Sequence, residues 1–118
     1  MSKDAIQTTD TAPTHDHHTV AKVALLLKQA LDHQRWKQLD EAESLATEAL
    51  NLARQELGDK HVTTAYALTD LAIIQEDQHK NVEARDNLIA ALEILEPALG
   101  GHHDQVSLIF TRLHHLFM

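Results

Sequence analysis

The stretch Gln55–Leu68, QELGDKHVTTAYAL, has a counterpart 42 residues later in Pro97–Phe110, PALGGHHDQVSLIF. Each stretch places Leu-Gly ahead of a histidine at the same spacing and then begins an apolar segment. The similarity extends on both sides when the sequence is aligned with itself at this offset. The aligned pairs include Val20 and Val62, Leu26 and Leu68, Ala30 and Ala72, Glu41-Ala42 and Glu83-Ala84, Ala49-Leu50 and Ala91-Leu92, and His61 and His103. A period of this length, built from small and leucine residues at helical spacing, indicates a helical repeat array.

Apolar residues at steps of three and four predict five helices. They are expected to begin near Thr19, Asp40, Val62, Asn81 and Asp104, with all but Val62 serving as N-caps. Gly58 and Gly100-Gly101 are expected to end the second and fourth helices. The predicted fold is all-α, a right-handed α-solenoid of antiparallel helix pairs. We assign residues 1–18 to a disordered, polar, His-rich tail and 19–118 to the repeat domain, divided into 19–60, 61–102 and a half repeat over 103–118.

The composition narrows the function. The formal charge of the 118 residues is −8, which disfavours nucleic acid and anionic membranes as partners, since both require a basic surface. No segment approaches the roughly 18 apolar residues of a membrane span, and the N-terminus lacks the hydrophobic segment of a secretory signal. Cysteine is absent, which excludes disulfides and fits a reducing compartment. A cytoplasmic protein is expected.

Each unit resembles a tetratricopeptide repeat, whose first helix carries large-x-x-Leu-small-x-x-aromatic and whose second carries Ala-x-x-x-large-x-x-Ala. The matching residues are Leu68, Leu71, Ala72 and Gln75, then Ala84, Leu88 and Ala91, with Leu26, Ala30, His33, Ala42, Ala46 and Ala49 in the first unit and Phe110, Leu113, His114 and Phe117 in the half unit. The 42-residue period and the Leu-Gly-x-x-His joints are similar to the repeats of kinesin light chains. Polar Gln29, His33 and Gln75 stand where leucine or an aromatic is expected, and His114 replaces a small residue. The proline expected after the joint histidine is also absent.

The resemblance implies an adaptor or scaffold without catalytic activity, which binds a protein or peptide on the concave face lined by the first helix of each pair. The residues that it places there are Leu27, Leu31, Arg35, Tyr66, Thr69, Asp70, Ile73, Glu76, Asp77, Thr111, Arg112 and His115. Arg35 and Arg112 are the cations counted on this face, with Asp70, Glu76 and Asp77 between them. A neutral or basic ligand is therefore expected. The alternative is that these residues form an ordinary solvated surface.

The last predicted helix offers a second hypothesis, a self-associating structural subunit. Its apolar face has no following helix to cover it in this sequence, so either it packs back as a cap or it meets a second copy in a homodimer. The residues of this self-association face are Ile109, Phe110, Leu113, Leu116, Phe117 and Met118.

Ten histidines suggest a third hypothesis, a His-rich metal-binding protein. Adjacent pairs such as His114-His115 point about 100° apart on a helix, so they do not chelate one ion readily. We assign no metal ligand and no cofactor. No catalytic residues are assigned either, because the sequence contains no phosphate-binding loop, no cysteine and no nucleophile motif.

Overall fold

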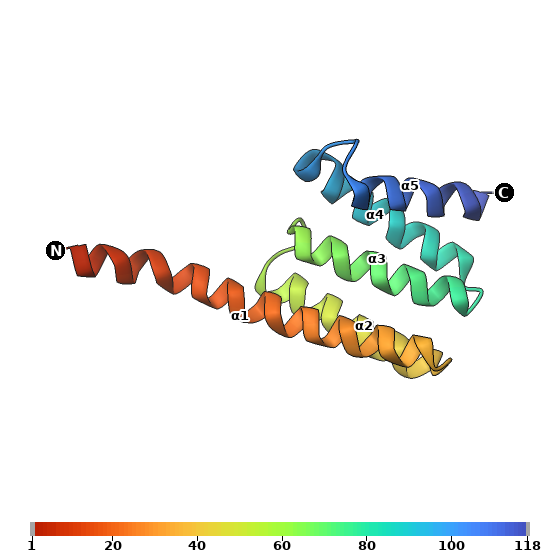
Figure 1. The fold of residues 1–118 in the computed structure, drawn as a ribbon, viewed down its shortest axis with the longest axis horizontal. Coiled ribbons are helices and arrows are strands. Elements are labelled where there is room, and N and C mark those ends of the chain that lie inside the picture. Colours follow the sequence, from red (N-terminus) through yellow and green to blue (C-terminus); the bar gives the residue numbers. More distant parts are fainter. Residues whose placement is uncertain (1, 118) are drawn as a thin grey trace.

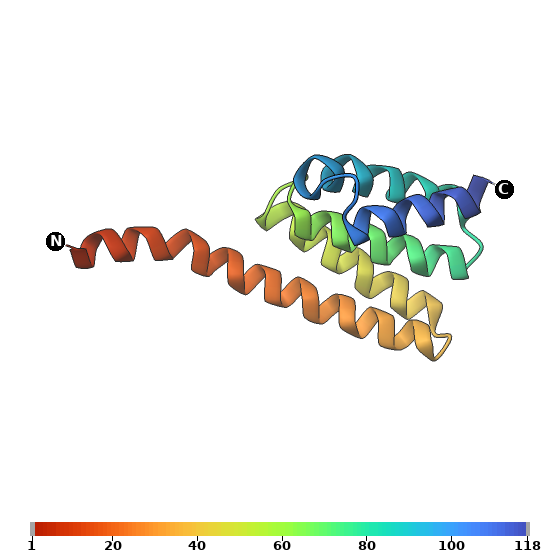
Figure 2. The same cartoon turned by 45° about the horizontal axis from the view of Figure 1, so that its top comes forward.

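The computed structural model describes the backbone of residues 2–117 and the side chains of residues 16–117. Over this range the chain forms five helices and no strand, as predicted: α1 (Ser2–Arg35), α2 (Leu39–Glu56), α3 (Val62–Asp77), α4 (Asn81–Leu99) and α5 (Asp104–Phe117). Helices α1 and α2 form one antiparallel hairpin and α3 and α4 a second, stacked on the first (Figure 1). Helix α5 packs on α4 at the end of the stack opposite α1 (Figure 1), and in Figure 2, where this end is turned forward, it overlaps α3 and α4. The all-α helix-pair solenoid is confirmed.

Alanine and leucine at helical spacing form the core between these helices. Ala30, Ala42, Ala72, Ala84 and Ala91 are fully buried, and such small side chains let neighbouring helix backbones approach closely. The larger core residues are Val23, Leu68, Ile74, Leu88, Leu95, Val106 and Ile109. None of the helices within residues 2–117 is both long enough and apolar enough to cross a membrane.

Helix α1 begins at Ser2, whereas the sequence indicates a disordered tail over residues 1–18 and a helix start at Thr19. Thr19 is not an N-cap but lies inside the helix, with 5% of its surface exposed. Thr19, Val23 and Leu27 follow one another at intervals of four and are all buried, so Thr19 belongs to the buried stripe of the helix and not to its start.

The two Leu-Gly-x-x-His joints share the conformation of their glycine and the role of their histidine. Gly58 and Gly100 have φ values of 102° and 92°, in the region that favours glycine. After each glycine, a histidine accepts a backbone hydrogen bond at the start of the next helix. His61 Nδ1 accepts from the Thr63 N–H at 3.0 Å, and His103 Nδ1 accepts from the Gln105 N–H at 3.1 Å. The joint histidines are therefore helix N-caps.

The remaining predicted caps were wrong. Helices α2 and α4 are preceded by Gln38 and Lys80, neither of which makes a side-chain cap hydrogen bond, and His103 takes the role expected of Asp104. The turns inside the two hairpins also have the same conformation at equivalent positions, since Lys37 and His79, 42 residues apart, have φ values of 63° and 64°. Backbone bonds that close these turns satisfy the last carbonyls of the preceding helices, α1 and α3. The Lys80 N–H, for example, donates to the Gln75 carbonyl at 2.8 Å.

Candidate functional site

The first helices of the repeats, α1, α3 and α5, form the surface that the sequence predicts to be concave, here called the α1–α3–α5 face. Lys28, Asp70 and Arg112 occupy equivalent positions on these three helices, 42 residues apart. Two hollows open on this face, one bounded by α1 and α3 and the other by α3 and α5. Eight of the twelve residues predicted for partner binding line one hollow or the other.

The first hollow has a volume of about 580 Å³. Its predicted members are Leu27, Leu31, Arg35 and Asp70, and Ala24, Lys28 and Asp32 complete the lining. The sequence-based count of cations on this face omitted Lys28, although the 42-residue alignment pairs it with Asp70 and so could have found it. Apolar side chains and charged groups of both signs therefore meet in this hollow.

Asp70 is the least satisfied charged group in the first hollow. It is mostly buried, and no hydrogen bond or ion pair joins its carboxylate to another of the described side chains. Burial raises the pKa of Asp70 from its ordinary 3.8 to about 6, and the positive charge of Arg112 opposes this rise only in part. Two of the nearby cations are engaged elsewhere, since Lys28 Nζ lies 3.5 Å from Asp32 and an Arg112 guanidinium N–H donates to Glu76 at 3.0 Å; the third, Arg35, is exposed and makes no ion pair with Asp70.

The second hollow is smaller, at about 220 Å³. It is lined by the predicted residues Glu76, Thr111, Arg112 and His115, together with Leu108. The Arg112–Glu76 ion pair crosses from α5 to α3 and is largely shielded, with side-chain exposures of 32% and 16%. The Nε of Arg112 is buried and has no hydrogen-bond partner among the described residues.

The other four predicted residues lie on α3 outside both hollows. Tyr66 and Ile73 are partly buried. Thr69 is 3% exposed and its hydroxyl donates to the Ala65 carbonyl at 2.9 Å, so little of it faces a ligand. Asp77 is exposed and accepts a hydrogen bond of 2.8 Å from the Gln34 amide, which links α1 to α3.

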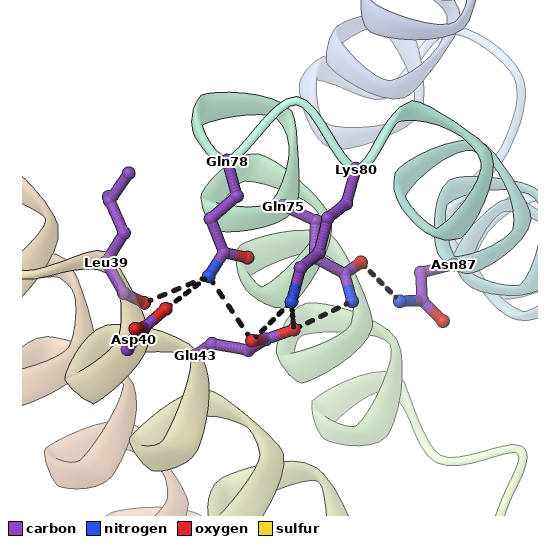
Figure 3. Close-up of polar contacts among 7 residues, drawn as sticks. All are labelled: Leu39, Asp40, Glu43, Gln75, Gln78, Lys80 and Asn87. Carbon is purple, nitrogen blue, oxygen red and sulfur yellow. Dashed lines mark hydrogen bonds and ion pairs between the residues drawn. The ribbon is translucent and has the colours of Figure 1, made fainter.

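A polar network on a different side of α3 explains the departure from the aromatic repeat position (Figure 3). Gln75 is 6% exposed, and its carbonyl accepts from the Asn87 amide at 2.8 Å. Glu43 on α2 accepts from Lys80 Nζ at 2.9 Å, from the Gln78 amide at 3.3 Å and from the Gln75 amide at 3.5 Å. Burial raises the pKa of Glu43, but these donors outweigh it and hold the pKa below 4.5. The network joins the two repeats, so Gln75 is structural.

The residues of the predicted self-association face lie on two different sides of α5. Ile109 and Leu113 are buried against α4, and Leu116 is partly buried. Phe110 and Phe117 are more exposed, at 47% and 66% of their surface, and the Arg85 guanidinium of α4 lies 6.0 Å from the centre of the Phe117 ring. Met118 lies outside the described residues. The residues equivalent to Phe110 and Phe117, 42 positions earlier, are Leu68 and Gln75. These are only 2% and 6% exposed, because α4 covers that side of α3. We call the side of α5 that carries Phe110 and Phe117 its open side.

A third hollow, of about 520 Å³, lies between α1 and α2 and was not predicted. Leu25, Leu26 and Leu52 form its apolar part, and Lys22, Glu48, Asn51 and Gln55 its polar rim. Leu25 is 55% exposed, whereas its repeat equivalent Ala67 is fully buried, since α2 packs on α3 there. This hollow is therefore the free edge of the first repeat.

The histidines do not assemble into a metal centre within the described part of the chain, where no three His, Asp or Glu side chains lie close enough to share an ion. His61 and His103 serve as caps, as shown above. His33 Nδ1 lies 2.6 Å from Gln38 Oε1 at the first hairpin turn.

Comparison with known proteins gives one family. The family model described as "Tetratricopeptide repeat" matches residues 22–96, which span α1 to α4 and more than half of the chain. No curated protein shows significant sequence similarity to the chain.

Proposed function

The chain belongs to the tetratricopeptide repeat family, and we propose that it is an interaction module that binds a protein or peptide segment in the hollows of the α1–α3–α5 face. Repeats of this family generally mediate protein–protein interaction. The observation that supports the proposal for this chain is that side chains from three successive repeat units line two hollows on one surface. A non-catalytic adaptor, the 42-residue kinesin-light-chain type of repeat and a cytoplasmic location are parts of the same proposal.

A neutral or basic ligand suits this face better than an acidic one. Glu76 and Lys28 are already in ion pairs, and Asp77 accepts a hydrogen bond from Gln34. Asp70 has no such partner among the described side chains, and an acidic ligand would bring a second negative charge next to it. An acidic group of a ligand would instead find its counter-charge at Arg35, which is exposed.

Selection from a random peptide display library against the immobilised full chain tests the proposal. Ala24 is exposed and lines the first hollow, so Ala24→Trp fills the hollow without disturbing the core. Ala98 on α4 is also exposed and lines neither hollow of this face, which makes Ala98→Trp the matched control. We expect selected peptides to lose binding to Ala24→Trp and to keep it with Ala98→Trp. Peptides that bind both variants equally, or no selection at all, would contradict the proposal.

A second candidate function, self-association through the open side of α5, is supported by the exposure of Phe110 and Phe117 at positions whose repeat equivalents are covered. Sedimentation equilibrium of the full chain at rising concentration tests it. A dimer that is lost on Phe110→Ser with Phe117→Ser, and kept on Leu25→Ser, is the expected result. A monomer throughout the concentration range rules this function out.

A further inference from the structure

Asp70 occupies an unusual position for a carboxylate that is ionised at neutral pH. Its side chain is mostly buried at the wall of the first hollow and has no hydrogen-bond donor among the described residues. Buried carboxylates are normally paired or hydrogen-bonded, because removing the charge from water is costly. A group left in this state at the wall of a hollow is well placed to receive a donor from outside the chain.

The charged groups that face this hollow do not meet the need. From α1, Lys28 is paired with Asp32, and Arg35 is exposed and makes no ion pair with Asp70. From α5, the Arg112 guanidinium is directed to Glu76, so it acts on Asp70 only as a more distant charge. The hollow thus presents one acidic group whose counter-charge is missing.

The rest of the lining specifies the shape of the missing group. Ala24, Leu27 and Leu31 provide an apolar surface beside Asp70. Lysine and arginine side chains combine an aliphatic stem with a cationic, hydrogen-bond-donating head, and they commonly lay the stem on apolar surface. An acidic group would be repelled by Asp70, and a purely apolar group would cover the carboxylate without pairing it.

We propose that the first hollow binds a lysine or arginine side chain of the partner, with its stem on Ala24 and Leu31 and its cationic head on the Asp70 carboxylate. This assignment rests on the proposed function and adds the residue class that the site selects. Asp70 is then the specificity-determining residue of the face.

The test uses isotope-labelled full chain titrated with blocked amino acids, the Nα-acetyl methylamides of lysine, arginine, norleucine and glutamate, followed by backbone amide chemical shifts. Norleucine has the lysine stem without the charge. We expect the lysine and arginine compounds to shift the amides of Leu27, Leu31 and Asp70 and to bind roughly tenfold more tightly than norleucine, the worth of a charge-assisted hydrogen bond in a partly buried site. The glutamate compound should bind least.

Two variants separate the role of Asp70 from a general effect of charge. Asp70→Asn should abolish the preference for lysine over norleucine. Asp86→Asn on α4 changes the net charge by the same amount at a residue that lines neither hollow, so the preference should persist. Equal binding of lysine and norleucine, or an equal loss in both variants, would overturn the assignment. If display peptides still bind the hollow in that case, the proposed function stands and only the basic-side-chain assignment fails. If neither peptides nor blocked amino acids bind, both fail.

Discussion

Replacing Asp70 by asparagine should stabilise the protein at neutral pH, although it removes a charged residue from a predicted binding surface. The pKa of Asp70 in the folded chain is raised from 3.8 to about 6 by burial. Each pKa unit corresponds to about 1.4 kcal/mol. At pH values well above the folded pKa, the ionised Asp70 therefore lowers the free energy of unfolding by about 3 kcal/mol. Asparagine keeps the shape but is itself polar and desolvated, which reduces the expected gain to about 1–3 kcal/mol.

The pH dependence fixes the sign of this effect. Because the folded pKa lies above the unfolded one, the folded state binds the proton more tightly between 3.8 and about 6. The cost of Asp70 is therefore absent below this window, grows as the pH rises through it, and is constant above it. The difference in unfolding free energy between Asp70→Asn and the parent chain should follow the same course. Taking this difference removes the contribution of the histidines, which titrate in both chains.

Urea unfolding followed by circular dichroism, at pH values from 4 to 7.5, measures this difference. Asp86→Asn on α4 is the matched control, since its side chain is 64% exposed, and its effect should stay within about 0.5 kcal/mol. If Asp70→Asn destabilised the chain at pH 7.5, Asp70 would have a cationic partner in solution, with Lys28, Arg35 and Arg112 as the candidates. A difference that is independent of pH would equally refute the reasoning.

Three further predictions concern the repeat architecture. His61→Ala should lower the unfolding free energy by about 1 kcal/mol through loss of the helix cap, while His61→Asn should retain most of it, as urea titration can show. Glu43→Gln should cost about 1–2 kcal/mol at neutral pH, because charge-assisted bonds from Lys80 and two glutamines are weakened. That cost should disappear as the pH falls through the folded pKa of Glu43, which lies below 4.5, and a cost that persists in acid would count against the network. Gly58→Ala should lower stability by about 1–2 kcal/mol, since its φ of 102° strains any other residue; an unchanged thermal melt would contradict this.

The repeat architecture was readable from the sequence because its determinants are local and recur. Small residues at helical spacing mark the buried sides, and the glycine–histidine joints mark the unit boundaries. His61 and His103 could be placed at helix entrances from the alignment alone. Helix starts were less predictable where no side chain caps them. Asn81 is the first residue of α4, and the N-cap position is taken by Lys80, which makes no side-chain cap hydrogen bond, so no cap residue in the sequence marks this start.

The character of the site could not be read from the sequence in the same way. The alignment places Asp70 on the predicted concave face, but its burial depends on how closely α1 and α3 pack. Asp70 has no ion-pair partner because Lys28 pairs with Asp32 and Arg112 pairs with Glu76. Which groups pair depends on how the helices pack in three dimensions, which the sequence alone does not show. Likewise, Gln75 looked like an imperfect aromatic position until Asn87 and Glu43 were seen to bind it.

The most direct test of the central claim is a chemical-shift map of the labelled full chain with the tightest peptide from the display selection. The account predicts that the perturbed amides cluster around the two hollows of the α1–α3–α5 face, with Asp70 among them, and that the peptide carries a basic residue. Perturbations confined to α2 and α4, or to the open side of α5, would contradict it.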